Sequence, residues 1–158
     1  MKKYILLLII PLVLHSCIEE DETLDPTIMP EITTHGADTF GCLIDNWLYV
    51  GGRFYYSFSS TFWGIPAEDC FSFKLNKETG NIEVNVMVRR DAFIQFTILH
   101  PQEGEETTYT NAKFGNKSLA NGTVKILRYD QQERIISGVF EGGKVTFGRF
   151  DMNYIEEE

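Results

Sequence analysis

The sequence is poor in the residues that build metal sites and nucleophilic active sites. It has three histidines and three cysteines among 158 residues, and none of them forms an HExxH segment or another histidine pair at metal-ligand spacing. A GxSxG turn around a serine and a glycine-rich phosphate loop are missing as well. We therefore expect no metal, no cofactor and no enzymatic activity.

Positive charge is also scarce in this chain. Lysine and arginine number 14 against 23 aspartates and glutamates, which gives a formal net charge of −9. A surface of this sign repels the phosphates of nucleic acid, so a nucleic-acid partner is not expected.

No apolar run is long enough to cross a bilayer, which requires a helix of about 20 residues. The longest candidate, residues 4–14, follows Lys2 and Lys3. A basic start and a short apolar run are typical of a secretory signal peptide. A buried N-terminal strand or helix is the alternative interpretation.

The residues after this run point to a lipid anchor. Leu14-His15-Ser16-Cys17 resembles the lipobox of bacterial lipoproteins, in which a small residue precedes the cysteine, although His15 departs from the usual pattern. The resemblance implies that residues 1–16 are a signal peptide and that the Cys17 sulfur carries lipid. One acyl chain holds a protein only marginally at a membrane, whereas two or more hold it stably.

An acidic block follows the predicted anchor. Residues 19–22 are all acidic, and residues 17–34 show no hydrophobic periodicity and contain Pro26 and Pro30. This composition predicts a solvated tether. The block also resembles the signal that sends Bacteroidetes lipoproteins to the outer face of the outer membrane, so the cell surface and the periplasmic face both remain open.

The remaining residues, 35–158, are predicted to form one all-β domain. Residues 82–88 alternate apolar and polar side chains, which is typical of a half-buried strand. Similar segments recur about every ten residues, separated by turns such as Asp45-Asn46 and Gly142-Gly143. We therefore expect an antiparallel β-sandwich or flattened barrel of about eight to ten strands, ending in a solvated acidic tail.

Two cysteines of this domain, Cys42 and Cys70, are candidates for a disulfide if the domain lies outside the cytoplasm. Two small buried thiols are the alternative.

Three aromatic residues, Trp47, Tyr55 and Trp63, are candidate ligand-binding residues. The C–H face of a sugar stacks on an exposed aromatic ring while polar neighbours bind its hydroxyl groups. The alternative is that these rings belong to the core, as aromatic side chains often do.

Acidic residues are grouped at Glu68-Asp69 and at Glu103, Glu105 and Glu106. Such groups can be imagined as the carboxylate pair of a glycoside hydrolase or as a calcium loop. A solvated loop is the simpler interpretation.

Three segments together resemble a family of Bacteroidetes lipoproteins of unknown function. They are ITTHGADTFGCLIDNWLYV, IISGVFEG and KVTFGRFDMNY. The family has a Gly-Ala-x-Thr-Phe-Gly-Cys-Leu start and a Gly-Arg-Phe-Asp end. The resemblance implies an all-β fold and anchoring through Cys17, and it carries over no catalytic residue.

These observations predict a non-enzymatic lipoprotein of the outer membrane, with a binding or accessory β-domain whose partner is an envelope protein or a glycan. A glycan-binding module that uses the exposed aromatics is the first alternative, and a carboxylate-based hydrolase is the second.

Overall fold

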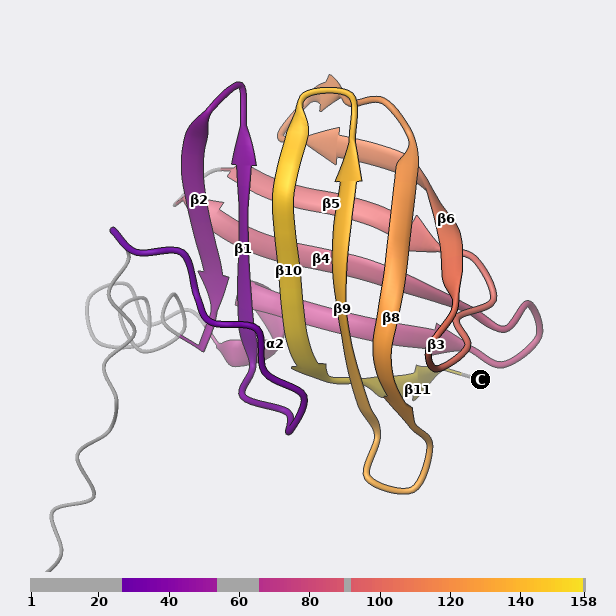
Figure 1. The fold of residues 1–158 in the computed structure, drawn as a ribbon. Helices are drawn as coiled ribbons and strands as arrows, with labels where there is room; N and C mark the ends of the chain where they lie inside the picture. The colour runs from indigo at the N-terminus through magenta and orange to yellow at the C-terminus, as the bar shows by residue number, and fades with distance from the viewer. Residues whose placement is uncertain (1–26, 54–65, 90–91, 158) are drawn as a thin grey trace, which may run out of the picture.

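The computed structural model describes residues 27–53, 66–89 and 92–157, and in this part the chain is all-β (Figure 1). The helical turn α2 (Ala67–Cys70) lies wholly within these ranges, and no described helix has the length and apolar character needed to cross a membrane. The strands are β1 (Thr39–Ile44), β2 (Trp47–Gly52), β3 (Phe71–Asn76), β4 (Asn81–Arg89), β5 (Ala92–Ile98), β6 (Glu106–Phe114), β7 (Lys117–Ser118), β8 (Gly122–Asp130), β9 (Ile135–Gly142), β10 (Val145–Asn153) and β11 (Ile155–Glu157).

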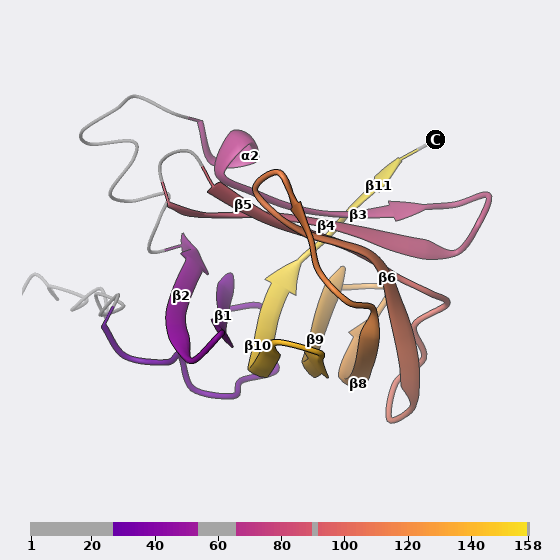
Figure 2. The same ribbon diagram turned by 90° about the horizontal axis from the view of Figure 1, so that it is seen from above.

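These strands form a single sheet that folds over on itself. Their order is β11-β3-β4-β5-β6-β8-β9-β10-β1-β2, with β7 paired to β6. Strands β8, β9, β10, β1 and β2 make a front layer in the view of Figure 1, and β3, β4 and β5 cross behind them as a back layer. Figure 2 shows the two layers from above, with β6 running between them at one side. The predicted all-β, mostly antiparallel fold is confirmed. The described part contains eleven strands instead of about eight to ten, and they form one open sheet that does not close into a barrel.

The core lies between the two layers. Phe140 of β9 contacts Phe96 of β5 with 5.1 Å between ring centroids, and Phe150 of β10 contacts Phe73 of β3 at 5.2 Å. Aromatic pairs at such spacings add to the hydrophobic gain from burying the rings. Aromatic contacts therefore join the front and back layers within a core that also contains many aliphatic side chains.

The predicted alternation in residues 82–88 is confirmed in β4. Ile82, Val84, Val86 and Val88 are all buried in the core. Met87 is buried too, because the pairing of β4 with β5 shifts register at that point. The alternation therefore holds along the strand until the irregularity near its end.

The two predicted hairpins are present, one of them displaced by a residue. Asp45 and Asn46 join β1 to β2 with φ of 51° and 65°, as a tight turn of two residues with positive φ requires. At the second hairpin Gly142 is already paired with Val145, so the turn consists of residues 143–144.

The candidate disulfide between Cys42 and Cys70 is not formed. Cys42 and Cys70 are both buried and are not bonded to each other. Cys42 lies on β1 between β10 and β2, whereas Cys70 ends α2, which packs on β3 and β4 of the back layer. A disulfide needs Cα atoms about 4.4–6.8 Å apart, and no strand pairing joins these two elements. The alternative of two buried thiols describes the structure.

The acidic C-terminus is more ordered than the sequence suggests. The chain leaves β10 in the front layer and crosses to the edge of the back layer, where β11 pairs in parallel with β3 (Figure 2). Glu157 lies 2.6 Å from Lys74 and Glu156 lies 2.9 Å from Lys77. Residues 155–157 are therefore an edge strand and not a solvated tail.

Candidate ligand-binding groove

Residues 29–38, here called the N-terminal strap, lie on the outer face of the front layer. Arg149 of β10 donates a hydrogen bond to the carbonyl of Pro30 at 3.2 Å, and Arg128 of β8 donates to the carbonyl of Thr34 at 2.8 Å. The sequence predicts a tether that extends to residue 34. Residues 30–34 instead belong to the folded part, so the domain begins earlier than residue 35.

The strap is held by the buried carboxylate of Asp151, which is here called the Asp151 latch together with the strap groups that it binds. Asp151 of β10 is 1% exposed and accepts hydrogen bonds from the Thr33 hydroxyl at 2.7 Å and from the backbone N–H groups of His35, Gly36 and Ala37 at 3.0, 2.8 and 3.2 Å. A buried carboxylate requires such donors because it has lost its water.

The hydrogen bonds decide the charge state of this latch. Burial by itself raises the pKa of the Asp151 carboxyl, but the four donors stabilise the ionised form and hold the pKa below its ordinary value. The latch therefore contains a carboxylate at neutral pH.

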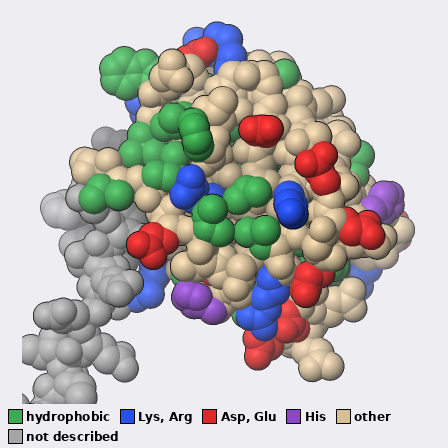
Figure 3. Space-filling model, in the orientation of Figure 1, with side chains coloured by type: hydrophobic (Ala, Val, Ile, Leu, Met, Phe, Trp, Pro, Cys, Tyr) green, Lys and Arg blue, Asp and Glu red, His purple; other side chains and the backbone are tan. Residues whose placement is uncertain are grey.

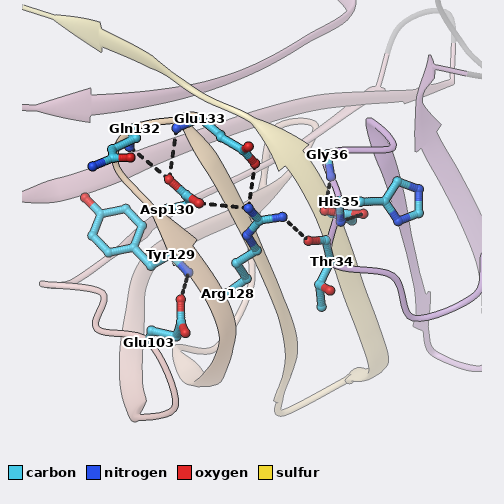
Figure 4. Close-up of polar contacts among 10 residues, drawn as sticks. Thr34, His35, Gly36, Glu103, Arg128, Tyr129, Asp130, Gln132 and Glu133 are labelled. Atoms are coloured by element: carbon cyan, nitrogen blue, oxygen red, sulfur yellow. Dashed lines mark hydrogen bonds and ion pairs between the residues drawn. The ribbon is translucent and has the colours of Figure 1, made fainter.

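The strap is also held by the ion cluster around Arg128, which Figure 4 shows. Its guanidinium donates to Asp130 at 2.8 Å and to Glu133 at 2.6 Å in addition to Thr34. Asp130 is held in turn by the backbone N–H groups of residues 132 and 133. The hydrogen bond to Asp130, followed by that to Glu133, raises the pKa of Arg128, so the cluster keeps the side chain charged and aimed at the strap.

The strap is also fitted to the sheet at both of its ends. Gly41 of β1 leaves the space that Pro30 occupies, since a Cβ at Gly41 would lie 2.6 Å from Pro30 Cδ. At the other end the Asn153 side chain donates to the carbonyl of Gly36 and to Asp38, both at 3.1 Å. The strap is thus part of the outer surface of the front layer.

Strand β10 carries an irregularity beside the strap. Between the pairs Val145↔Gly142 and Gly148↔Phe140, β10 advances by three residues and β9 by only two, which defines a β-bulge. Phe147 lies in this bulge with φ of 54° and is 67% exposed. A bulky side chain rarely adopts a left-handed backbone, which costs about 1–2 kcal/mol. The bulge therefore presents an aromatic ring to solvent at the expense of stability.

Phe147 borders an open groove of about 460 Å³, here called the outer groove. Its floor follows a row of paired residues on the outer face, in which Glu106 of β6 pairs with Lys125 of β8, Lys125 with Val139 of β9, and Val139 with Arg149 of β10. Ile32 of the strap, which is 54% exposed, forms part of the lining. Figure 3 views this face and shows hydrophobic side chains next to basic and acidic ones.

The polar groups of the outer groove are mixed and mostly uncommitted. Two cations, Lys125 and Arg149, and two carboxylates, Glu106 and Glu141, line it together with threonine hydroxyls. Within the described chain, Glu106, Lys125 and Glu141 form no ion pair and no side-chain hydrogen bond. The groove therefore contains both hydrogen-bond donors and acceptors that are free to bind a ligand.

The predicted aromatic site is only partly described. Trp47 begins β2 and is 70% exposed, which agrees with an exposed aromatic, but it does not line the outer groove. Tyr55 and Trp63 lie outside the described residues. The groove residue that the sequence reasoning missed is Phe147. Its signal is a break in alternation: Val145 and Phe150 both face the core although their positions differ by five, whereas residues on one face of a regular strand differ by an even number.

The back layer has a smaller, more polar counterpart of the outer groove. A depression of about 320 Å³ is lined by Lys74, Glu83, Asn85, Gln95 and Lys113 among others, and Gln95 donates to Asn85 at 2.9 Å. Its aromatic neighbour, Phe96, is buried in the core. This face lacks an exposed ring in its described part, so the outer groove is the stronger candidate.

The described residues contain no group of three or more histidines, cysteines, aspartates or glutamates placed to hold a metal ion. Comparison of this chain with protein-family models, with curated proteins and with solved structures gives no match. The class of protein is therefore defined by the fold and the site themselves: a folded-over β-sandwich with an open amphipathic groove on one face.

Proposed function

We propose that this protein is a non-enzymatic binding domain held at the outer membrane by lipid on Cys17. The observation that supports binding is the exposed, backbone-strained Phe147 at the outer groove. Strained residues that the surrounding fold maintains occur mainly at functional sites. An aromatic ring exposed beside uncommitted polar groups is the arrangement that small-ligand sites use.

The proposed anchor places the groove near the membrane. Residues 18–26 separate Cys17 from Thr27, the first described residue. Cys17 and Thr27 are ten positions apart, so even a fully extended chain would separate them by at most about 35 Å. The strap shortens the tether relative to the 17–34 segment predicted from sequence, because its residues are bound to the front layer. The domain is therefore held within roughly its own diameter of the lipid.

The anchor is tested by feeding cells labelled palmitate. We expect the wild-type chain and Cys42→Ala to carry the label and to fractionate with the outer membrane, and Cys17→Ala to lose both properties. Cys42→Ala is the matched control because it removes a cysteine that is buried in β1. Labelling and fractionation that persist in Cys17→Ala would refute the anchor. Protease treatment of intact cells then decides between the cell surface and the periplasmic face.

The hydrolase alternative has weaker support from the geometry. Glu106 and Glu141 line the same groove, but both are exposed, whereas the acid of a glycosidase pair has its pKa raised by burial. Of the acidic loop, Glu103 accepts a hydrogen bond from the backbone N–H of Tyr129 at 3.0 Å and so has a structural contact (Figure 4). His35 contributes its backbone N–H to Asp151, and its ring points away from the Arg128 cluster.

A further inference from the structure

The chemistry of the outer groove selects among ligand classes. Its lining combines an exposed aromatic ring, two cations, two carboxylates and the hydroxyls of Thr123 and Thr146. Cations only donate hydrogen bonds, ionised carboxylates only accept them, and hydroxyls do both. A ligand that matches this mixture must offer donors and acceptors at the same positions and must have an apolar face for the ring.

We propose that the outer groove binds a neutral saccharide chain, with a sugar ring stacked on Phe147. This inference rests on the proposed binding function and names its ligand. Every sugar hydroxyl both donates and accepts, so Glu141 and Arg149 can each bind one without a net charge in the ligand. The C–H face of a sugar ring is the apolar surface that an aromatic side chain contacts.

The pairing of the strands argues against an extended peptide. A peptide that binds to a sheet as an added strand needs a free strand edge. The floor of the outer groove is formed by β6, β8, β9 and β10, and each of these strands has a paired strand on both sides. The groove therefore offers side chains and no backbone edge to a ligand.

The charges argue against an acidic polymer. The groove has as many carboxylates as cations. Glu141 lies on β9, where it is opposite Thr123 of β8 and next to the β10 bulge that carries Phe147. The whole chain has a formal charge of −9. A polyanion would meet repulsion both locally and at long range.

The experiment is a calorimetric titration of the full chain, purified in detergent, with neutral oligosaccharides such as glucans, mannans and xylans, and with polygalacturonate. We expect at least one neutral oligosaccharide to bind, with an affinity that changes little with salt. Phe147→Ala should weaken this binding by about three- to tenfold, which is the value of one aromatic contact. Phe147→Trp should retain it.

The matched control is Ile155→Ala. Ile155 is also a large exposed apolar residue, at 53%, but it lies on β11 at the edge of the back layer. Its loss should leave the affinity unchanged. Thermal melting of each variant shows whether the fold is retained.

Several results would overturn the inference. They are absence of binding to every neutral oligosaccharide, binding only to polygalacturonate with strong salt dependence, and binding that Phe147→Ala and Ile155→Ala weaken equally. A chain that is acylated at Cys17 but binds no neutral saccharide refutes this inference and leaves the anchor intact. A chain that fails the Cys17 test refutes the anchor whatever the titration shows.

Discussion

The Asp151 latch gives the sharpest test of how the N-terminal strap is held. Asp151→Asn keeps the shape of the side chain but removes its charge. An asparagine oxygen in place of Oδ2 can still accept from Thr33, His35 and Ala37, whereas the NH2 group in place of Oδ1 faces the N–H of Gly36. A hydrogen bond to a charged group contributes about 1.5–3 kcal/mol and one between neutral groups about 0.5–1.5 kcal/mol. Losing one bond and weakening the other three therefore predicts a decrease of roughly 3 kcal/mol in the free energy of unfolding. Detachment of the strap limits the loss, because water then satisfies the donors.

The prediction is measured by thermal melting and amide hydrogen exchange at pH 7. For a chain of this size, a loss of about 3 kcal/mol lowers the Tm by roughly 6–12 °C. The amides of His35, Gly36 and Ala37 should exchange faster, because they are the donors to Asp151. The control is Asp45→Asn, which breaks an exposed ion pair with Lys144 at 2.9 Å and should cost about 0–1 kcal/mol. Equal Tm values and unchanged exchange in the two variants would refute the reasoning.

The same latch predicts how stability responds to acid. The native pKa of Asp151 lies below the ordinary carboxyl value, so the unfolded state binds this proton more readily. The stabilisation is complete above the ordinary pKa of about 3.9 and is lost as the pH falls through the lower native value. Asp151→Asn should therefore be destabilised most at neutral pH, and its difference from wild type should shrink in acid. A difference that grows toward low pH would contradict this sign.

Two further predictions concern strain and thiol reactivity. Phe147→Gly should be no less stable than wild type and as much as about 1 kcal/mol more stable by urea unfolding, because glycine adopts the left-handed backbone freely, whereas Phe147→Ala keeps the strain and should show no gain. A clear destabilisation of the glycine variant would show that the ring contributes packing instead. Burial raises the pKa of the Cys42 thiol to about 12, so alkylation at pH 8 should be slow until the protein is unfolded in urea. Mass spectrometry of the peptide that contains Cys42 measures this, and rapid labelling of the native protein would contradict the burial.

The parts of the fold that depend on local pattern could be predicted from the sequence. The alternation of β4 and the Asp45-Asn46 turn are both encoded within a few residues. The parts that depend on distant partners could not. The strap has no periodicity of its own, and it is ordered by Asp151 and Arg128, which lie more than 90 residues later in the chain. β11 is ordered in the same way by β3.

The candidate site shows the same division. An exposed aromatic could be expected at Trp47 from composition, but its position relative to the groove depends on how β1, β2 and β10 are arranged. Phe147 looks like a core residue in a strand of alternating side chains. Only the bulge turns it outward, and a bulge depends on the register of β10 with both β9 and β1. In a sequence, such a residue is indicated where the alternation of apolar and polar positions along a strand is interrupted.

An early and a late segment of the described chain meet at Asp151. In the pairing of β1 with β10, Thr39 lies opposite Asp151 and Gly41 lies opposite Arg149. The segments Gly36–Gly41 and Gly148–Asp151 thus together hold the strap against the front layer. Ile32, which lines the groove, precedes the latch in the chain and so lies on the side of the proposed anchor. If Cys17 carries lipid, a pulling force on the tether is transmitted to Ile32 before it reaches the hydrogen bonds of Asp151.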